Sequence, residues 1–437
     1  MPHMSNVKII LKSGRDKPVR QHHPRLFSGG IKAIDGRPKS GEVVEIFDNH
    51  GEWIARGVIN EASQIAIRLL TWDVNEAIDD AFWQRRVAQA VARRKVDPLL
   101  RDTNARRIIF GESDGLPGVI ADDYAGHIVL EYSALVALNA RNVIEAAIQA
   151  ACAPAQIHIR YDDERLKGEG VSAKLFGPSA PALVAAPKNA ALPTEAATII
   201  REGALQFRVD LTRGQKTGFY LDQRQNRQRV AAYCTGGRML NTFSYTGGFA
   251  IYAAAAGATE IINVDSSADA LRLAHENALL NGLGIKDYGL GINDNPQSSI
   301  SNPQSPVPNP QSLITNIQAN VFDDLRARRE AGELYDVVVL DPPKFAHNPS
   351  QIERAARAYK DLNRVGMHLV KPGGVLATFS CSGVVDASLF QKIIFSAAME
   401  AGREVHIVEH LSQASDHPVL LTFPESEYLK GLICRVY

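Results

Sequence analysis

The feature that most constrains the fold is an apolar run, Val337 to Leu340, which ends in Asp341-Pro342-Pro343-Lys344. Such a run, closed by an acid and two prolines, is typical of a buried parallel strand. Because proline has a fixed φ and no amide donor, the strand stops there and Asp341 stands on a stiff turn. The next similar run, Val375 to Phe379, ends in Ser380-Cys381-Ser382-Gly383. We therefore expect an acid and a thiol at neighbouring strand ends.

These runs belong to a regular alternation that begins at Arg238. Earlier strand-like runs are Met239 to Phe243, Ile261 to Val264 and Ile317 to Phe322, and the helix-like segments between strands are Gly248 to Ala256, Ala268 to Leu280 and Glu353 to Val370. Such alternation predicts an α/β domain with a Rossmann-like, doubly wound parallel sheet over residues 201–437. Asn-Pro-Gln-Ser recurs at Asn295, Asn302 and Asn309, so we interpret residues 292–312 as a disordered insertion.

The chain before this domain divides into two smaller parts. Residues 1–73 combine short β runs with Gly-rich turns and predict a small β domain. Residues 74–200 begin with a basic helix, Asp79 to Lys95, and continue as a central α+β domain. They end in a Pro/Ala-rich loop at 177–193.

Composition narrows the class of protein. The chain has 48 Lys and Arg and 48 Asp and Glu, so its formal net charge is zero. Residues 1–39 nevertheless hold nine Lys or Arg against two Asp. This local excess is explained either by binding to phosphate groups or by a solvated basic terminus. No run of about 18 apolar residues occurs, and no signal peptide is visible, so we expect a cytoplasmic protein without membrane contact. The four cysteines are widely spaced and predict free thiols, with no metal site.

Ligands of parallel α/β sheets bind outside the carboxyl ends of the strands. The first strand is followed by Ser244 to Phe249, whose glycines allow a ligand to approach the backbone and whose helix N-terminus favours an anion. Asp265 follows the second strand and is placed to bind a ribose diol, and Asn320 belongs to the third strand. The Gly-x-Gly-x-x-Gly of a nicotinamide enzyme is missing from the first turn. Acids that only cap helices would explain any one of these residues, but not all five strand ends.

Several of these motifs resemble those of class I S-adenosylmethionine (SAM)-dependent methyltransferases. The matching features are Ser244 to Gly248, Asp265 and Asp341-Pro342-Pro343-Lys344. Nearly the whole chain is similar to bacterial 23S rRNA cytosine-C5 methyltransferases with an N-terminal PUA domain; the matching blocks are His23 to Gly29, Gly214 to Arg224, Asn241 to Ala250, Asp341 to Phe345, Tyr359 to Asn363, Phe379 to Gly383, Asp416 to Pro418 and Tyr428 to Gly431. Asn320 departs from the family's expected Asp, although its amide suits an adenine edge.

The resemblance implies roles for individual residues. It assigns SAM binding to Ser244, Tyr245, Gly247, Asp265, Ser266, Asn320 and Gln223. It assigns RNA contacts to His23 and Arg25 in the PUA-like domain and to Lys216, Arg224 and Lys344. Lys216 and Arg224 are equally explained as partners of nearby acids, and Lys344 as a surface residue. The implied partner is large-subunit ribosomal RNA in an unassembled or partly folded state, and a homodimer is left open.

The implied chemistry explains the acid and the thiol. Cytosine C5 is a poor nucleophile until a thiolate adds to C6, and Cys381 is the candidate thiol. Asp341 is placed to offset charge at N3 and the exocyclic amine. Cys152, Cys234 and Cys434 are interpreted as inert. The base that removes the C5 proton is not identified. Methylation of uridine C5 or a guanine nitrogen, and a non-catalytic RNA-binding assembly factor, are the alternatives.

Overall fold

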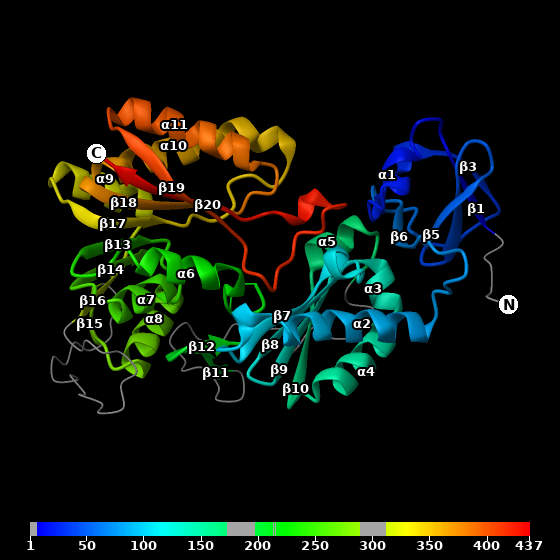
Figure 1. The fold of residues 1–437 in the computed structure, drawn as a ribbon, viewed down its shortest axis with the longest axis horizontal. Helices are drawn as coiled ribbons and strands as arrows, with labels where there is room; N and C mark the ends of the chain where they lie inside the picture. Colours follow the sequence, from blue (N-terminus) through cyan, green and yellow to red (C-terminus); the bar gives the residue numbers. More distant parts are fainter. Residues whose placement is uncertain (1–6, 173–196, 213, 215, 289–311) are drawn as a thin grey trace. The chain divides into compact units, whose positions relative to one another are not determined.

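The computed structural model describes residues 7–172, 197–212, 214, 216–288 and 312–437 (Figure 1). The loop predicted at 177–193 lies outside these residues, as do residues 292–311 of the insertion predicted at 292–312. The chain divides into two compact units, of which unit 1 contains Met1–Thr198, Val209–Phe219 and Ser415–Ser426, and unit 2 contains Ile199–Arg208, Tyr220–Ala414 and Glu427–Tyr437. The segments 209–219 and 415–426, predicted for the last domain, therefore belong to unit 1. Sequence periodicity carries no information on such long-range returns of the chain.

The first part of unit 1 is a six-stranded sheet in the order β2-β6-β5-β4-β1-β3. Its elements are β1 (Lys8–Leu11), α1 (Lys17–Arg20), β2 (Arg25–Leu26), β3 (Ile31–Asp35), β4 (Val43–Phe47), β5 (Trp53–Ile59) and β6 (Ile67–Thr71). Apolar side chains from these strands form one buried cluster, including Ile9, Leu11 and Ile46. β2 and β3 give no strand signal in the sequence, because β2 has two residues and the side chains of β3 are mostly exposed.

The second part of unit 1 is a four-stranded sheet in the order β10-β9-β8-β7. Its elements are α2 (Asp80–Lys95), β7 (Ala105–Phe110), β8 (Val119–Tyr124), β9 (His127–Tyr132), α3 (Leu135–Asn139), α4 (Arg141–Cys152), β10 (Gln156–Tyr161) and α5 (Asp163–Gly168). The predicted basic helix is present as α2, which begins where the Asp79 side chain accepts a hydrogen bond from the Phe82 amide.

Unit 2 is built on an eight-stranded sheet in the order β15-β16-β14-β13-β17-β18-β20-β19. Its strands are β13 (Arg238–Thr242), β14 (Glu260–Asp265), β15 (Gly284–Tyr288), β16 (Leu313–Gln318), β17 (Tyr335–Leu340), β18 (Val370–Ser380), β19 (Val405–Ser412) and β20 (Lys430–Val436). The first six strands in this order, from β15 at the edge to β18, pair in parallel, as predicted for the doubly wound sheet. β20 runs antiparallel to both β18 and β19. A mixed edge of this kind is common on doubly wound sheets. A separate two-stranded sheet pairs β11 (Ala197–Glu202) with β12 (Leu205–Asp210).

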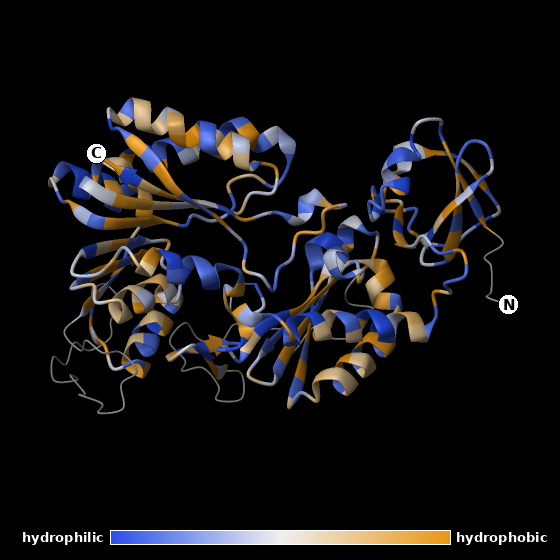
Figure 2. Ribbon diagram, in the orientation of Figure 1, coloured by the Kyte–Doolittle hydropathy of each residue, from blue (hydrophilic) through white to orange (hydrophobic). Residues whose placement is uncertain are grey.

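Helices cover both faces of the large sheet (Figure 1). They are α6 (Arg224–Ala231), α7 (Gly248–Ala255) and α8 (Ala268–Leu280) on one face, and α9 (Val321–Glu330), α10 (Ile352–His368) and α11 (Ala387–Ala401) on the other. The central strands are coloured mainly apolar in Figure 2, because a strand covered on both faces buries every side chain. In β17, Val337 to Leu340 are at most 1% exposed. This packing fixes the carboxyl ends of the strands.

Candidate active site

Five predicted site residues meet at one edge of the large sheet. β16, β14, β13, β17 and β18 are consecutive neighbours and run in parallel, so their carboxyl ends point the same way. Asp265 is the last residue of β14, and Ser244, Asp341 and Cys381 follow β13, β17 and β18 directly or within two residues. The third strand ends at Gln318 rather than at Phe322. Asn320 is therefore the N-cap of α9 and not a strand residue.

The loop after β13 has an unusual backbone. Phe243 and Tyr245 have φ values of 53° and 48°, and Gly247 has a φ of 76°. Positive φ is costly for residues with a side chain and clusters at functional sites. A Cβ atom on Gly247 would lie 3.2 Å from the Ala274 Cβ. The loop is thus held close to α8. Gly247 is the N-cap of α7, which begins at the next residue.

This loop presents buried polar atoms that the protein does not satisfy. Ser244 Oγ and Thr246 Oγ1 have no hydrogen-bond partner among the residues that the structure describes. Buried hydroxyl groups are normally hydrogen-bonded, so an unpaired one needs an explanation such as a ligand. Two hydroxyls beside a helix N-terminus suit the carboxylate and amino group of an amino-acid moiety.

Asp265 contacts this loop, and Asn320 follows the neighbouring strand β16. The Asp265 carboxylate accepts hydrogen bonds from the Tyr245 and Ser267 amides, both at 2.9 Å. Each carboxylate oxygen can accept more than one bond, so capacity for a ribose diol is left. Asn320 Oδ1 accepts from the Phe322 amide at 3.0 Å and thus caps α9. Ser266 is exposed next to Asp265.

Asp341 is held by a residue that was assigned to the cofactor. Gln223 is buried and donates from Nε2 to Asp341 Oδ2 at 2.9 Å, while Asn226 donates to Gln223 Oε1 at 2.6 Å. Gln223 therefore fixes the orientation of the carboxylate. Tyr220 lies nearby, edge-on to the ring of Tyr245 at 5.1 Å between centroids. Burial, and secondly the charge of Asp341, raise the pKa of Tyr220, so its hydroxyl is protonated at neutral pH.

Cys381 is half-buried on a segment that two serines hold in place. Ser380 Oγ donates to the Tyr359 hydroxyl at 2.9 Å, and Ser382 Oγ lies 3.1 Å from the same hydroxyl. The thiol itself lies 4.0 Å from the Pro342 carbonyl oxygen, at the turn that carries Asp341. The turns after β17 and β18 are therefore adjacent.

The other three cysteines were predicted to be inert. Burial raises the pKa of the Cys152 thiol to about 11 and those of Cys234 and Cys434 to about 12. A thiol of this kind is almost fully protonated at neutral pH and unreactive. These values agree with the prediction that the three residues are inert.

Of the predicted RNA contacts, two are exposed lysines and the other three have acidic partners within the protein. Lys216 and Lys344 are exposed, as a phosphate contact requires. Arg224 is 2% exposed and lies 3.3 Å from the Glu202 carboxylate, so its surroundings favour the structural alternative. In unit 1, Arg25 pairs with Glu112 at 2.6 Å, and its guanidinium lies 4.4 Å from the Phe423 ring centre. His23 Nε2 lies 3.4 Å from Glu425.

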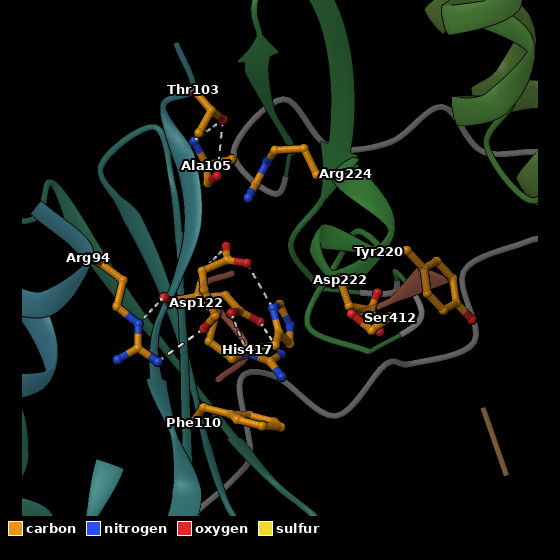
Figure 3. A network of polar contacts seen from close by, with 12 residues as sticks. Arg94, Thr103, Ala105, Phe110, Asp122, Tyr220, Asp222, Arg224, Ser412 and His417 are labelled. Carbon is orange, nitrogen blue, oxygen red and sulfur yellow. Dashed lines mark hydrogen bonds and ion pairs between the residues drawn. The ribbon is translucent and has the colours of Figure 1, made fainter. Parts of the chain in front are cut away.

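The Asp416-His417 motif belongs to a buried polar network of unit 1 (Figure 3). Asp416 Oδ2 accepts from the Arg107 amide at 3.0 Å, and Asp416 Oδ1 lies 2.9 Å from His417 Nδ1. Arg94 donates to the Asp416 carbonyl at 3.0 Å, and the Phe110 ring centre is 5.4 Å from that of His417. These contacts tie the segment 415–426 to the second sheet of unit 1. They indicate a structural role.

The residues that the structure describes contain neither a metal-binding cluster nor a membrane-spanning helix. No group of three or more His, Cys, Asp or Glu side chains in this part of the chain is arranged to hold a metal ion. Within the same residues, every helix is too short or too polar to cross a membrane.

Comparisons with known proteins agree with this geometry. Residues 9–72 match a PUA-like domain, and residues 184–291 match an S-adenosylmethionine-dependent methyltransferase domain. The crystal structure of SMU.776 complexed with SAH has the same fold, with a TM-score of 0.75 at 20% identity over 98% of this chain and 99% of that one. The fold and site thus define a SAM-dependent methyltransferase with a PUA-like domain.

Sequence relatives define the family more closely. "Ribosomal RNA large subunit methyltransferase I" of Aeromonas salmonicida is 42% identical over 98% of this chain and 99% of its own length. The protein of the same name from Shewanella amazonensis is 41% identical over 99% of this chain and 100% of its own length. The chain belongs to the ribosomal RNA large subunit methyltransferase I family.

The structure also brings in residues that motif reasoning did not assign to the site. The charge of Asp341 acts on Tyr220, and Tyr359 contacts Ser380 and Ser382 on either side of the thiol. Lys430, at the start of β20, is buried and donates to the Ser382 carbonyl. Lys430 lies in the matching block Tyr428 to Gly431, and it is a cation that opens the otherwise apolar run Gly431 to Cys434. Its partner strand could not be known from the sequence.

Proposed function

We propose that this protein methylates C5 of a cytosine in large-subunit ribosomal RNA, with Cys381 as the nucleophile that adds to C6. The family name supports ribosomal RNA of the large subunit as the substrate. The choice of C5 depends on one observation, a thiol at the end of β18 beside the Asp341 turn. Asp341, placed for N3 and the exocyclic amine, supports cytosine as the base. Transfer to a nitrogen needs no covalent adduct, so a thiol at this place favours carbon methylation.

In this mechanism the thiolate of Cys381 forms a bond to C6, and the ring electrons make C5 nucleophilic. SAM, when bound, supplies the methyl group that C5 accepts. Loss of the C5 proton and breakage of the sulfur–C6 bond then restore the aromatic ring and release the thiolate. Asp341, held by Gln223, is placed to offset charge at N3 and the exocyclic amine during addition.

Residues at the edge of the sheet divide the remaining tasks. The proposal assigns the cofactor to Ser244, Tyr245, Gly247, Asp265, Ser266 and Asn320. Lys216 and Lys344 are exposed cations that suit phosphates, and the PUA-like domain supplies further basic residues. The target base must leave its stack to reach a half-buried thiol, so loop or single-stranded RNA is the expected substrate.

A trapping experiment tests the proposal. Large-subunit RNA containing 5-fluorocytidine should form a denaturation-stable adduct with wild-type protein and SAM, because fluorine at C5 cannot leave as the proton does. Cys381→Ala should form none, whereas the matched control Cys152→Ala should form as much as wild type. Nucleoside mass spectrometry of unmodified RNA should show 5-methylcytosine. Wild-type turnover by Cys381→Ala, or a product other than 5-methylcytosine, would contradict the proposal.

A further inference from the structure

Lys430 is a cation at an unexpected place in the sheet. It opens β20, and it stands opposite Ser380 in the antiparallel pairing of β20 with β18. Ser380 immediately precedes Cys381. Lys430 is 5% exposed, although lysine is almost never buried without a partner.

The hydrogen bonds of Lys430 aim its ammonium at the cysteine segment. Nζ donates to the Ser382 carbonyl and to the Tyr428 carbonyl, both at 2.8 Å. Lys430 therefore contacts both sequence neighbours of Cys381. Its backbone is paired with Ser380, and its ammonium donates to the carbonyl of Ser382. Among the residues that the structure describes, Lys430 forms no ion pair with a carboxylate. The cost of burying this amine is therefore not offset by a salt bridge.

The charges around Lys430 come from several elements. The pKa of Lys430 is lowered to about 8, and burial is the largest cause. The charges of Cys381, Glu427 and Asp386, in decreasing order, raise this pKa, and the charge of Lys344 lowers it. Cys381 is thus the group that most favours the charged amine. Electrostatic coupling is mutual, so the ammonium favours the thiolate by the same amount.

The acid and the two tyrosines near the cysteine segment do not stabilise a thiolate, whereas a buried cation does. Asp341 is an acid on the neighbouring turn, and a second anion next to it is unfavourable. Tyr220 and Tyr359 are held neutral, since burial raises the pKa of each hydroxyl.

We propose that Lys430 is the positioning residue that keeps Cys381 in its reactive thiolate form. In the step concerned, the sulfur–hydrogen bond breaks, the proton passes to solvent, and the electron pair stays on sulfur beside the ammonium. This inference deepens the proposed function and rests on Cys381 being the nucleophile. It assigns a role before addition to the base, not in removal of the C5 proton.

Alkylation by iodoacetamide tests this without RNA or SAM, because only the thiolate reacts. The rate for the Cys381 peptide is followed by mass spectrometry from pH 5 to 10 in the full chain. For wild type we expect a midpoint clearly below the ordinary thiol value of about 8.5. Lys430→Met should raise the midpoint by about one pH unit and so slow alkylation about tenfold at pH 7. Lys430→Arg, which keeps the charge, should stay near wild type.

Internal controls separate a charge effect from damage to the strand. Cys434 lies on the same strand and should remain unreactive in all variants, whereas its exposure would reveal that β20 has opened. In that case the reciprocal variant decides: Cys381→Ser should lower the pH midpoint for competitive acetylation of Lys430. An ordinary midpoint in wild type, equal midpoints in wild type and Lys430→Met, or an unchanged Lys430 midpoint in Cys381→Ser would overturn the proposal. None of these readouts depends on which base is methylated.

Discussion

At the residue scale, Glu202 is a buried carboxylate of unit 2 with several hydrogen bonds. It accepts two hydrogen bonds from Arg227 Nη2, both at 2.7 Å, and one from the Tyr252 hydroxyl at 3.0 Å. Arg224 lies on its other side at 3.3 Å. These contacts link β11 to α6 and α7. Since α6 and α7 support the Gln223 segment and the Ser244 loop, we expect this cluster to stabilise the site.

Breaking the Glu202 cluster should be costly. Arg227→Ala leaves a buried carboxylate without its main partner, and we expect the free energy of unfolding to fall by about 3–5 kcal/mol. Arg229→Ala is the matched control, because Arg229 is on the same helix, 65% exposed and paired with Glu409 at 3.0 Å. That exposed pair should contribute about 1 kcal/mol or less. Urea unfolding followed by circular dichroism measures both, and equal losses would show that the buried cluster contributes no more than the surface pair.

Asp265 should control cofactor affinity. Asp265→Ala removes the predicted ribose contact as well as the acceptor of the Tyr245 and Ser267 amides. We expect SAM affinity to fall by roughly tenfold or more, as for loss of a charged hydrogen bond. Isothermal titration calorimetry is the measurement, with Asp269→Ala, an exposed acid on α8, as control. Wild-type affinity in Asp265→Ala would remove this residue from the cofactor site.

At the element scale, a row of side chains crosses the sheet beneath the cofactor loop. Asn241 of β13 donates to Asn263 of β14 at 2.8 Å, and Asn263 donates to Asn316 of β16 at 3.0 Å. Asn316 donates to Asp287 of β15 at 2.9 Å, and His275 of α8 contacts the other oxygen of that carboxylate. Each donor faces its acceptor because the strands pair in register. The row therefore fixes strand order under the loop.

The end of this row should make stability depend on pH. The hydrogen bond to Asp287 is the largest influence and raises the pKa of His275, while burial opposes it. The folded pKa thus exceeds the unfolded value of about 6.5, so the stabilisation is complete below pH 6.5 and is lost as pH rises through the folded pKa. His275→Gln should lower the thermal midpoint more at pH 5.5 than at pH 9. The exposed His406→Gln is the control, and a loss independent of pH would contradict this origin.

The loop between β13 and α7 should not accept a side chain at Gly247. Gly247→Ala places a Cβ 3.2 Å from that of Ala274 at a φ of 76°. We expect a destabilisation of about 1–3 kcal/mol together with weaker SAM binding, since the loop must move away from α8. Gly402→Ala has a similar φ of 64° with open space around it, so it isolates backbone strain from crowding. Differential scanning fluorimetry with and without SAM compares them, and identical behaviour would exclude crowding.

At the scale of the whole molecule, RNA binding should depend on the basic surface of the PUA-like domain. Lys12 and Lys32 are exposed there. If both contact phosphates, Lys12→Gln with Lys32→Gln should reduce the slope of log affinity against log salt by about 1.4–1.8. Lys392→Gln on α11, also exposed, is the control. Filter binding at several salt concentrations gives the slopes, and an unchanged slope would indicate that RNA is held elsewhere.

The sequence by itself determined strands β13, β14, β17 and β18, helices α7, α8 and α10, and the two turns that carry chemistry. It did not predict β15, β19, β20, α6, α9 or α11. Hydrophobic periodicity and the positions of proline and glycine are local signals. They correctly predicted that Asp341 and Cys381 follow buried parallel strands. They placed the third strand too late, because the N-cap of α9 at Asn320 was included in it. The identity of the cofactor, SAM, came from the resemblance to the family and not from these local signals.

Only the tertiary structure decided which distant segments become neighbours. Nothing local indicates that β20 pairs with β18 and brings Lys430 to Cys381, or that Gln223 reaches Asp341. Likewise, a charged residue shows its partner only after folding, and so Arg224 proved to be buried against Glu202. The physical reason is that periodicity specifies which face of an element is buried, whereas strand order and long-range contacts depend on how complete elements pack together.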